Sequence, residues 1–468
     1  MNVSNEVRSE STSAFRKILF SSPRLGTSIV LGIEGWALFT LYTSGYRLHP
    51  FLAGFSIAMG YLTIAFSQFL LGWISDAKYT RWGRRKPYII IFAPILGISI
   101  IFLLLPRLII DLDDTSTFSF MGLTFQNKPL FLWMLLWEIL FRASYAVTTP
   151  YQAWMAEEFP VNERPKVSQF QNTFNYLGNG IMALFSLIIL TRYIGAIEAA
   201  GTPNIAIPIL MLIPIIIFGI LTVVLFYIIA FKMPTEPNYK IESNLIQNLR
   251  TILKNKNFML VVFMVGISGL GWSMITTVML AYLEDVLVLG TTEYIIAAVA
   301  LLLTIFIFLY LWRRGIQKRG KKKTLLLVFL LAVLFMPVSL LGLIPLQSYL
   351  IIGIIFIVGI GAILGGWFLF PYIVYADLAE DDQKSTGELK AGIYAGFPSI
   401  ILNLFQAGGA FFIGIILSLP ELTRYYATPI YSFSIGFIIF GPIVSIILLV
   451  SYFYTKKFIE LDFNWEKK

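Results

Sequence analysis

Long apolar segments recur along the chain from residue 24 to residue 455, and short polar loops separate them. Each approaches the roughly 20 apolar residues that a helix needs to cross a bilayer. Three stretches, 88–105, 294–312 and 354–376, contain no charged residue, and in hydrocarbon such a backbone is satisfied only as a helix or in a closed barrel. The pattern therefore predicts an all-α integral membrane protein. Its twelve helices are expected at residues 24–47, 50–75, 88–105, 129–155, 168–191, 206–231, 258–283, 294–312, 324–346, 349–376, 391–419 and 428–455.

The composition agrees with this prediction and excludes several functions. Hydrophobic residues make up 57% of the 468 positions, charged residues 13%, and the mean hydropathy is +0.79, whereas soluble domains carry about 25% charged residues. The absence of cysteine excludes disulfides, thiol catalysis and cysteine-bound metals. The single histidine, His49, lies in a loop beside Pro50 and has no second histidine with which to form a metal site or a catalytic dyad. We therefore expect no metal and no cofactor.

The basic residues indicate the orientation in the membrane, because Lys and Arg near span ends stay cytoplasmic. With the N-terminus inside, only five of the 35 fall in outer loops, namely Arg47, Arg107, Lys128, Arg192 and Arg424. Both termini are therefore expected in the cytoplasm and the chain in the plasma membrane. The N-terminal tail lacks an apolar core, so no cleaved signal peptide is expected. The net charge of +9 is attributed to this topology and to contact with anionic membrane lipid, not to nucleic acid.

Two basic loops suggest an internal duplication. Residues 81–86 read Arg-Trp-Gly-Arg-Arg-Lys, residues 318–323 read Lys-Arg-Gly-Lys-Lys-Lys, and an apolar helix follows each. A second pair of motifs supports the duplication: Pro150-Tyr151 with Ala156-Glu157, and Pro371-Tyr372 with Ala376-Asp377. Its offset is slightly shorter, as the long outer loop 106–128 in the first half would produce. We therefore expect a six-helix bundle at residues 1–231 with a tail at 1–23, a linker at 232–257, and a second bundle with its tail at 258–468. Two paired bundles around a midplane site are typical of secondary transporters.

The first basic loop and its surroundings are candidates for a gating loop that latches the cytoplasmic ends of the spans. Topogenic charge alone is the simpler interpretation of such loops, but the register with the repeat favours the specific one. Gly72, which precedes the loop, allows two helices to approach closely. Asp76 can cap its helix or pair with the arginines of the loop. The candidate gating residues are Gly72, Asp76, Arg81, Gly83, Arg84, Arg85 and Asp377.

These motifs resemble those of a known family. Gly72-Trp-Ile-Ser-Asp76 followed by Arg81-Trp-Gly-Arg-Arg-Lys-Pro87 is similar to the loop 2–3 motif of the major facilitator superfamily, in the lengthened form of the glycoside–pentoside–hexuronide:cation symporters. Ala376-Asp-Leu378 with the Thr386-Gly and Gly392-Ile-Tyr motifs resembles their loop 10–11 signature, and Gly35-Trp-Ala-Leu38 with Gln68 resembles the sucrose/proton symporter branch. The resemblance implies a major-facilitator-type bundle of 12 helices in two six-helix repeats.

The departures from the family pattern are also informative. Sodium-using sugar permeases of this family carry two aspartates four residues apart on span 2, and the matching positions here are Ile64 and Gln68. This difference favours protons over sodium as the coupling ion. The essential span-4 aspartate and an arginine of the plant sucrose symporters correspond here to Phe141 and Gln152, so those two roles do not carry over by position.

Only three ionisable residues, Glu34, Glu138 and Arg142, lie well inside predicted spans. Placing such a charged side chain inside a membrane helix costs on the order of 2.5–3.5 kcal/mol on insertion scales, so each is expected to have a structural or functional role. They fall on spans 1 and 4, which line the central cavity in the family that the chain resembles. We expect them to couple proton movement to transport. The alternative is that Glu138 and Arg142, four residues apart on one helix face, form a pair that only lowers its own insertion cost.

Polar and aromatic residues on the same spans are candidates for binding a sugar. Polar residues spaced three and four apart draw one stripe along span 4, and asparagines draw a second along span 5. Indole rings can stack on the apolar face of a pyranose, although many Trp residues are lipid-facing or interfacial anchors. The candidate substrate-binding residues are Trp36, Gln68, Trp137, Tyr145, Thr149, Gln152, Asn172, Asn175, Trp272, Trp367 and Gln406. The outer acids Glu284 and Asp285 are expected to be solvated.

The sequence therefore predicts a proton-coupled symporter that imports a sugar or glycoside by alternating access, without enzymatic activity and as a monomer. One alternative is an uncoupled facilitator or exporter of another small organic solute, because a fold does not determine a function. A membrane-embedded enzyme is the other. It would need a nucleophile, base or metal constellation, which this sequence does not offer.

Overall fold

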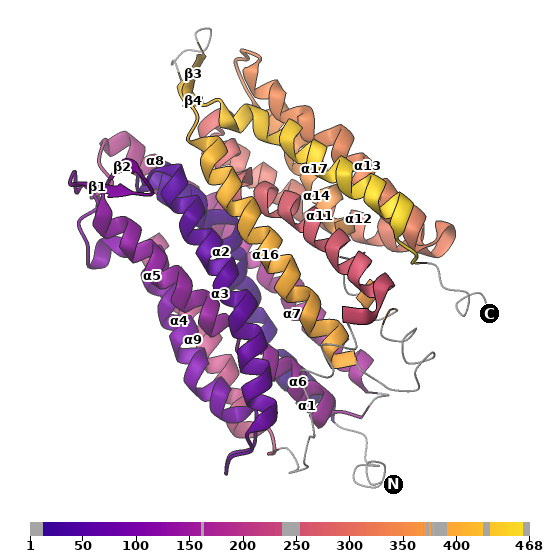
Figure 1. The fold of residues 1–468 in the computed structure, drawn as a ribbon. Helices are drawn as coiled ribbons and strands as arrows, with labels where there is room; N and C mark the ends of the chain where they lie inside the picture. Colours follow the sequence, from indigo (N-terminus) through magenta and orange to yellow (C-terminus); the bar gives the residue numbers. More distant parts are fainter. Residues whose placement is uncertain are drawn as a thin grey trace, which may run out of the picture.

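The computed structural model describes residues 13–160, 163–235, 253–367, 369–370, 374–375, 378, 391–424 and 431–461. Within these residues, twelve helices are long and apolar enough to cross a membrane, which confirms the predicted all-α membrane architecture. In Figure 1 the helices of the first six spans and those of the last six lie side by side.

The first six spans use helices that are often broken into two or three consecutive pieces. They are α1 (Ala14–Ser21), α2 (Pro23–Thr40) and the π-helical η1 (Leu41–Gly45) in span 1, α3 (Pro50–Ala77) in span 2, α4 (Lys86–Leu104) in span 3, α5 (Lys128–Tyr145) and α6 (Thr148–Glu158) in span 4, α7 (Arg164–Leu184), the π-helical η3 (Phe185–Leu190) and α8 (Thr191–Ala200) in span 5, and α9 (Ile209–Lys232) in span 6. The break in span 4 has a local cause, because Pro150 lacks the N–H that would bond to Ala146 and its ring crowds that carbonyl.

The last six spans are more continuous. They are α11 (Lys256–Ala281) with the π-helical η4 (Tyr282–Val286), α12 (Thr291–Arg319), α13 (Lys321–Phe335) with the 3-10 helix η5 (Met336–Leu343), α14 (Leu350–Trp367), α16 (Ala391–Leu417) and α17 (Gly436–Phe458). The expected start of the last span at residue 428 is wrong. Residues Tyr431–Ser434 form strand β4, which pairs antiparallel with β3 (Glu421–Arg424), and the helix begins only at Gly436.

A second hairpin occupies the loop after span 3, which the apolar pattern predicts only as a loop. Strands β1 (Thr117–Phe120) and β2 (Leu123–Gln126) pair antiparallel around the two-residue turn Met121-Gly122. Both turn residues have positive φ, 50° and 81°, as a type I′ hairpin turn requires. The hairpin lies against span 2, because the rings of Phe120 and Phe55 pack edge to face with centroids 5.0 Å apart.

The two ends of the bundle are distinct. We call the end with both β-hairpins the hairpin face, and the opposite end, where the described chain begins at Ser13 and stops at Leu461, the terminal face (Figure 1). Spans 2 and 11 touch backbone to backbone near the hairpin face. A Cβ added to Gly54 would lie 2.7 Å from the Ala410 carbonyl oxygen, and one added to Gly414 would lie 2.9 Å from the Pro50 carbonyl oxygen.

A hydrogen bond also joins the first and last six spans at the hairpin face. The Ser44 hydroxyl donates to the Asp285 carboxylate at 2.9 Å, between η1 and η4. Together with the contact between Gly54 and Gly414, this bond holds the two groups of spans together at this end of the molecule.

The glycine contact predicts a position-dependent substitution effect. Gly54→Val should lower the melting temperature of the protein in detergent by several degrees, because overpacking a tight contact typically costs about 1–3 kcal/mol. Gly195→Val is the matched control, since a Cβ at Gly195 meets no atom within 4 Å. Thermal unfolding of both variants tests this prediction, and equal shifts would contradict it.

Candidate functional site

A buried ion cluster joins span 1 to span 4 in the middle of the membrane. The Arg142 guanidinium donates from Nη2 to Glu34 Oε1 at 2.6 Å and from Nε to Glu138 Oε1 at 3.1 Å. Glu34 is 1% exposed, Glu138 0% and Arg142 3%. The three ionisable residues predicted from the sequence therefore form one cluster. Glu138 and Arg142 do not form an isolated ion pair within one helix, because Arg142 also binds Glu34 on α2.

Span 2 supplies the remaining wall of this cluster. The guanidinium of Arg142 lies over the ring of Tyr61, 4.3 Å from its centroid, a cation–π arrangement that stabilises a desolvated cation. The preceding residue, Gly60, makes room for the cluster, since a Cβ there would overlap the Glu138 carboxylate. Tyr61 also lies close to Ser273 of α11, so the cluster reaches the last six spans.

The charges in this cluster do not balance when every group is ionised. One guanidinium faces two carboxylates, and Oε2 of Glu34 and Oε2 of Glu138 are both buried without a hydrogen-bond partner. The two carboxyl groups lie close to one another, because both bind the same guanidinium. Buried acceptors normally find a donor, and two carboxylates provide none. A single proton on one of the two groups would supply the missing donor and neutralise the excess charge.

The predicted polar stripes lie in a different layer, nearer the terminal face. Ser28 of α2 donates to Oδ1 of Asn175 at 2.5 Å, and Ser28 lies six residues before Glu34, about 9 Å along the helix axis. Arg24 lies one layer further, about 15 Å from Glu34 along α2. It donates to the side-chain oxygen of Gln152 when the Gln152 amide is turned so that its oxygen faces Arg24. These residues follow one side of α2 and do not surround the ion cluster.

The other polar candidates are also spread along the spans. Tyr145 is buried beside Phe141 at the end of α5. Thr149 lies beyond the break in span 4, where a Cβ at Gly72 would meet its methyl group at 3.2 Å. The expected single stripe on span 4 is therefore divided between α5 and α6. Gln68 is half-buried on α3, and Asn172 is exposed on α7.

The four candidate tryptophans have different surroundings. Trp272 of α11 and Trp367 of α14 are buried and stack on each other with ring centroids 5.4 Å apart, and the Nε1 of Trp272 has no hydrogen-bond partner. Trp137 instead stacks on Phe102 of α4 at 4.8 Å. It points away from Glu138, because neighbouring residues on a helix are rotated by about 100°. Trp36 is half-buried.

The space beside the ion cluster has two notable features. A Cβ at Gly35, directly after Glu34, would meet no atom within 4 Å, so α2 borders open space there, next to Trp36. On the side of the last six spans, the Ser273 hydroxyl donates to the backbone carbonyl of Gln406 at 2.9 Å. This bond fixes α11 against α16 beside Trp272.

The candidate gating loop binds α3, α4 and α6 to one another within the first six spans. Arg85 forms an ion pair with Glu157 at 2.6 Å and donates to the Ser75 hydroxyl at 2.7 Å. Gly83 turns the loop at a φ of 92°, which favours glycine. Arg84 is buried with its guanidinium over the Tyr79 ring.

The remaining gating candidates are Arg81, Asp76 and Asp377. Arg81 is exposed beside Trp82. The side chain of Asp76 and the whole of Asp377 lie outside the described residues. The role of this loop as a latch stays a prediction.

The expectation that Glu284 and Asp285 are solvated is wrong. Span 7 continues as the π-helical η4 beyond the predicted end, and both side chains are half-buried between the two groups of spans. Asp285 accepts from Ser44 at 2.9 Å, and Glu284 accepts from the Tyr294 hydroxyl. In the described part of the chain, no three His, Asp or Glu side chains are placed to hold a metal ion.

Sequence reasoning missed three residues that complete the cluster: Gly60, Tyr61 and Ser273. Their contacts join elements that are distant in the chain, and no periodic pattern predicts such contacts. The adjacent Gly60 and Tyr61 in the middle of span 2 were the one available signal, because a small residue followed by a hydroxyl-bearing ring allows close approach and offers a polar contact.

Comparisons with known proteins agree with this architecture. Residues 19–457 match the family model described as MFS/sugar transport protein. No curated protein matches the chain in sequence. Among solved structures, a D-xylose-proton symporter is similar with a TM-score of 0.61 and 13% identity, over 95% of this chain and 96% of that one.

Two further solved structures have the same fold. The nucleoside transporter NupG gives a TM-score of 0.59 and 11% identity, over 94% of this chain and 99% of that one. A bacterial homologue of the human lysosomal transporter Spinster, inward-facing and occupied, gives 0.60 and 12%, over 94% and 95%. At these identities the likeness concerns the fold alone.

The ion cluster predicts a rescue between charged positions. Arg142→Gln should strongly destabilise the protein, because removing one partner of a buried ion pair costs about 3–5 kcal/mol. The triple variant Arg142→Gln, Glu34→Gln, Glu138→Gln removes all three charges and should recover a large part of the melting temperature. If the triple variant were less stable than the single one, the charge balance would not control stability at this site.

The space for Glu138 predicts a second effect. Gly60→Ala should displace the Glu138 carboxylate and lower the melting temperature, whereas Gly35→Ala adds the same methyl group where nothing lies within 4 Å. Gly35 is adjacent to Glu34 in the chain, so both substitutions lie next to the ion cluster. They differ in whether the added methyl group contacts another side chain. Equal behaviour of the two variants in thermal unfolding would show that Gly60 is not needed for the packing of Glu138.

Proposed function

Because the chain belongs to the MFS/sugar transport protein family, we propose that it is a proton-coupled symporter that imports a sugar or glycoside by alternating access. The observation that carries this proposal is the buried cluster in which Arg142 faces both Glu34 and Glu138. Two buried carboxyl oxygens there lack a donor, and a single proton would satisfy them.

The coupling follows from the geometry of this cluster. With the proton bound, one carboxyl group is neutral and Arg142 is balanced by the other. When the proton leaves, both carboxylates compete for one guanidinium, and the charge arrangement between α2 and α5 changes. Because Tyr61 packs on Arg142 and lies close to Ser273, such a change would reach the interface between the two groups of spans. Proton release would thereby favour the opposite orientation of the carrier.

The solute is proposed to bind between the charged and the aromatic sides of this interface. The Trp272 and Trp367 pair lies on the last six spans, with the Nε1 donor of Trp272 free for a hydroxyl acceptor. Trp36 lies beside open space on α2. Aromatic rings flanked by a few polar groups are typical of small-molecule sites, and sugars offer both an apolar face and hydroxyl groups.

We also propose the orientation in the membrane. The terminal face is assigned to the cytoplasm because basic residues are concentrated there, with the plasma membrane as the location and the monomer as the working unit. The loop containing Arg85 and Glu157 would hold the cytoplasmic ends of spans 2, 3 and 4 as one unit while the carrier changes orientation.

An uncoupled facilitator or exporter of another small organic solute is the main alternative, and a membrane-embedded enzyme is a distant one. A ligand screen by thermal shift separates the solute classes, because a ligand that binds the native state raises its apparent stability. Mono- and disaccharides and nucleosides should be tested at two pH values, with and without sodium. Stabilisation by a sugar that is larger at the lower pH and independent of sodium supports the proposal.

Substitution of Glu34 should separate coupling from exchange. In proteoliposomes, Glu34→Gln should abolish sugar accumulation driven by a proton gradient, since the cluster can no longer take up and release the proton. Counterflow of the same sugar should persist. Glu421→Gln, which removes an exposed carboxylate outside the spans, is the matched control. Undiminished gradient-driven accumulation in the Glu34 variant would exclude it from coupling.

Closure at the hairpin face provides a test of alternating access. The chain has no natural cysteine, so Ser44→Cys with Asp285→Cys introduces a single pair at the hydrogen bond that joins the two groups of spans. Cross-linking this pair with a short bifunctional thiol reagent should stop transport, while either single variant treated alike should keep it. Full transport by the cross-linked protein would contradict alternating access at this face.

A further inference from the structure

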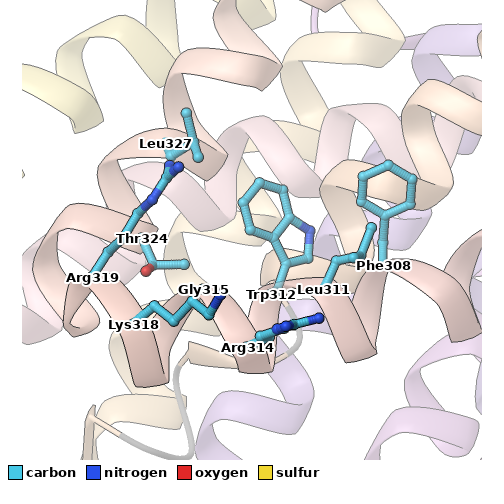
Figure 2. Close-up of a pocket in the computed structure, with 9 residues that line it drawn as sticks. All are labelled: Phe308, Leu311, Trp312, Arg314, Gly315, Lys318, Arg319, Thr324 and Leu327. Carbon is cyan, nitrogen blue, oxygen red and sulfur yellow. The ribbon is translucent and has the colours of Figure 1, made fainter.

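A groove of about 320 Å³ opens between α12 and α13 near the terminal face. Figure 2 shows the Trp312 indole in the middle of it, with Phe308 to one side and Lys318 and Arg319 to the other. The lining residues are Phe308, Leu311, Trp312, Arg314, Gly315, Lys318, Arg319, Thr324 and Leu327. They include three cations and no acid, and neither the ion cluster nor the proposed transport cycle uses them.

The floor of the groove is rigid. The Trp312 Nε1 donates to the Ala362 carbonyl at 2.8 Å, which fixes the indole against α14. Gly315 brings α12 close to α13, because a Cβ there would meet the Thr324 methyl group at 3.2 Å. The Thr324 hydroxyl donates to the Gly320 carbonyl at the turn between the helices. The groove is therefore a fixed feature of the packing of these two helices.

The groove is amphipathic along the membrane normal. Span 8 runs toward the terminal face, so Phe308 and Leu311 lie deeper in the bilayer than Lys318 and Arg319. Leu327 lies seven residues into the returning helix of this pair, about 10 Å below the turn. Leu311 is 46% exposed and Leu327 38%, so the deep part offers an uncovered apolar wall. The shallow part offers positive charge at the level of the headgroups.

The positive charge has no partner within the described protein. Among the described residues, no hydrogen bond or ion pair joins Arg314, Lys318 or Arg319 to an acid. A second groove at this face, near Arg81 and Trp82, differs in this respect, because its Lys86 already donates to the Met233 carbonyl at 2.7 Å. The groove between α12 and α13 therefore has cations available for a ligand.

We propose that this groove binds one anionic phospholipid of the leaflet at the terminal face. The phosphate would lie among Arg314, Lys318 and Arg319, and an acyl chain would follow Phe308, Leu311 and Leu327. Basic pockets between membrane helices recognise acidic headgroups in this way. A soluble anion would use the cations and leave the apolar wall uncovered, and a zwitterionic lipid would cover the wall without balancing the cations.

The test uses the whole protein in detergent, titrated with phosphatidylglycerol, with binding followed by native mass spectrometry and thermal shift. The triple variant Arg314→Gln, Lys318→Gln, Arg319→Gln should bind roughly 100-fold more weakly, at about five-fold for each cation lost. The control triple variant Arg313→Gln, Lys322→Gln, Lys323→Gln loses the same charge from neighbouring positions that do not line the groove. It should bind about as tightly as the unchanged protein, because the cations that line the groove are kept.

Three outcomes would overturn the proposal. The first is that phosphatidylcholine stabilises the protein as much as phosphatidylglycerol. The second is that the control triple variant loses as much binding as the groove variant. The third is that glycerol phosphate alone reproduces the effect, which would indicate a soluble-anion site. If the groove triple variant does not fold, Lys318→Gln alone decides the matter. Its side chain is exposed, and about five-fold weaker binding is expected.

Discussion

One guanidinium held between two carboxylates inside a helix bundle is the constraint on which the centre of this molecule depends. Desolvating an ion costs several kcal/mol even after the surroundings relax, so Arg142 and Glu34 require each other across spans 1 and 4. The rest of the site follows from this requirement. Gly60 leaves the volume that Glu138 occupies, and the Tyr61 ring covers one face of the cation.

The two groups of spans carry different side-chain chemistry. The buried ion cluster belongs to the first six spans, whereas the last six spans present the stacked pair of Trp272 and Trp367. Tyr61 of the first group lies close to Ser273 of the second. This division suits the proposed carrier, in which one group of spans would sense charge and the other would contact the solute.

The sequence predicted the architecture well because the bilayer imposes a strong rule on backbone polar groups. It also identified Glu34, Glu138 and Arg142, since charge inside an apolar span is conspicuous. It could not predict Tyr61 or Ser273 as partners, because those contacts depend on how the helices are packed. Trp137 illustrates the same limit, because nearness to Glu138 along the chain does not bring the two side chains to one face. The β-hairpins were missed because four-residue strands lack the length of the apolar signal.

The contact between Gly54 and Gly414 lies near one end of two long helices, and this position has a mechanical consequence. Gly54 is followed by 23 more residues of α3, or roughly 35 Å of helix. In the proposed alternating-access cycle, a contact so far from the centre would serve as a pivot with a long lever arm. A relative rotation of about 15°, a size known for subunit movements in other proteins, would displace the far end of this arm by roughly 9 Å. Small side-chain rearrangements near the middle could thus open a passage at the terminal face while the glycines hardly separate.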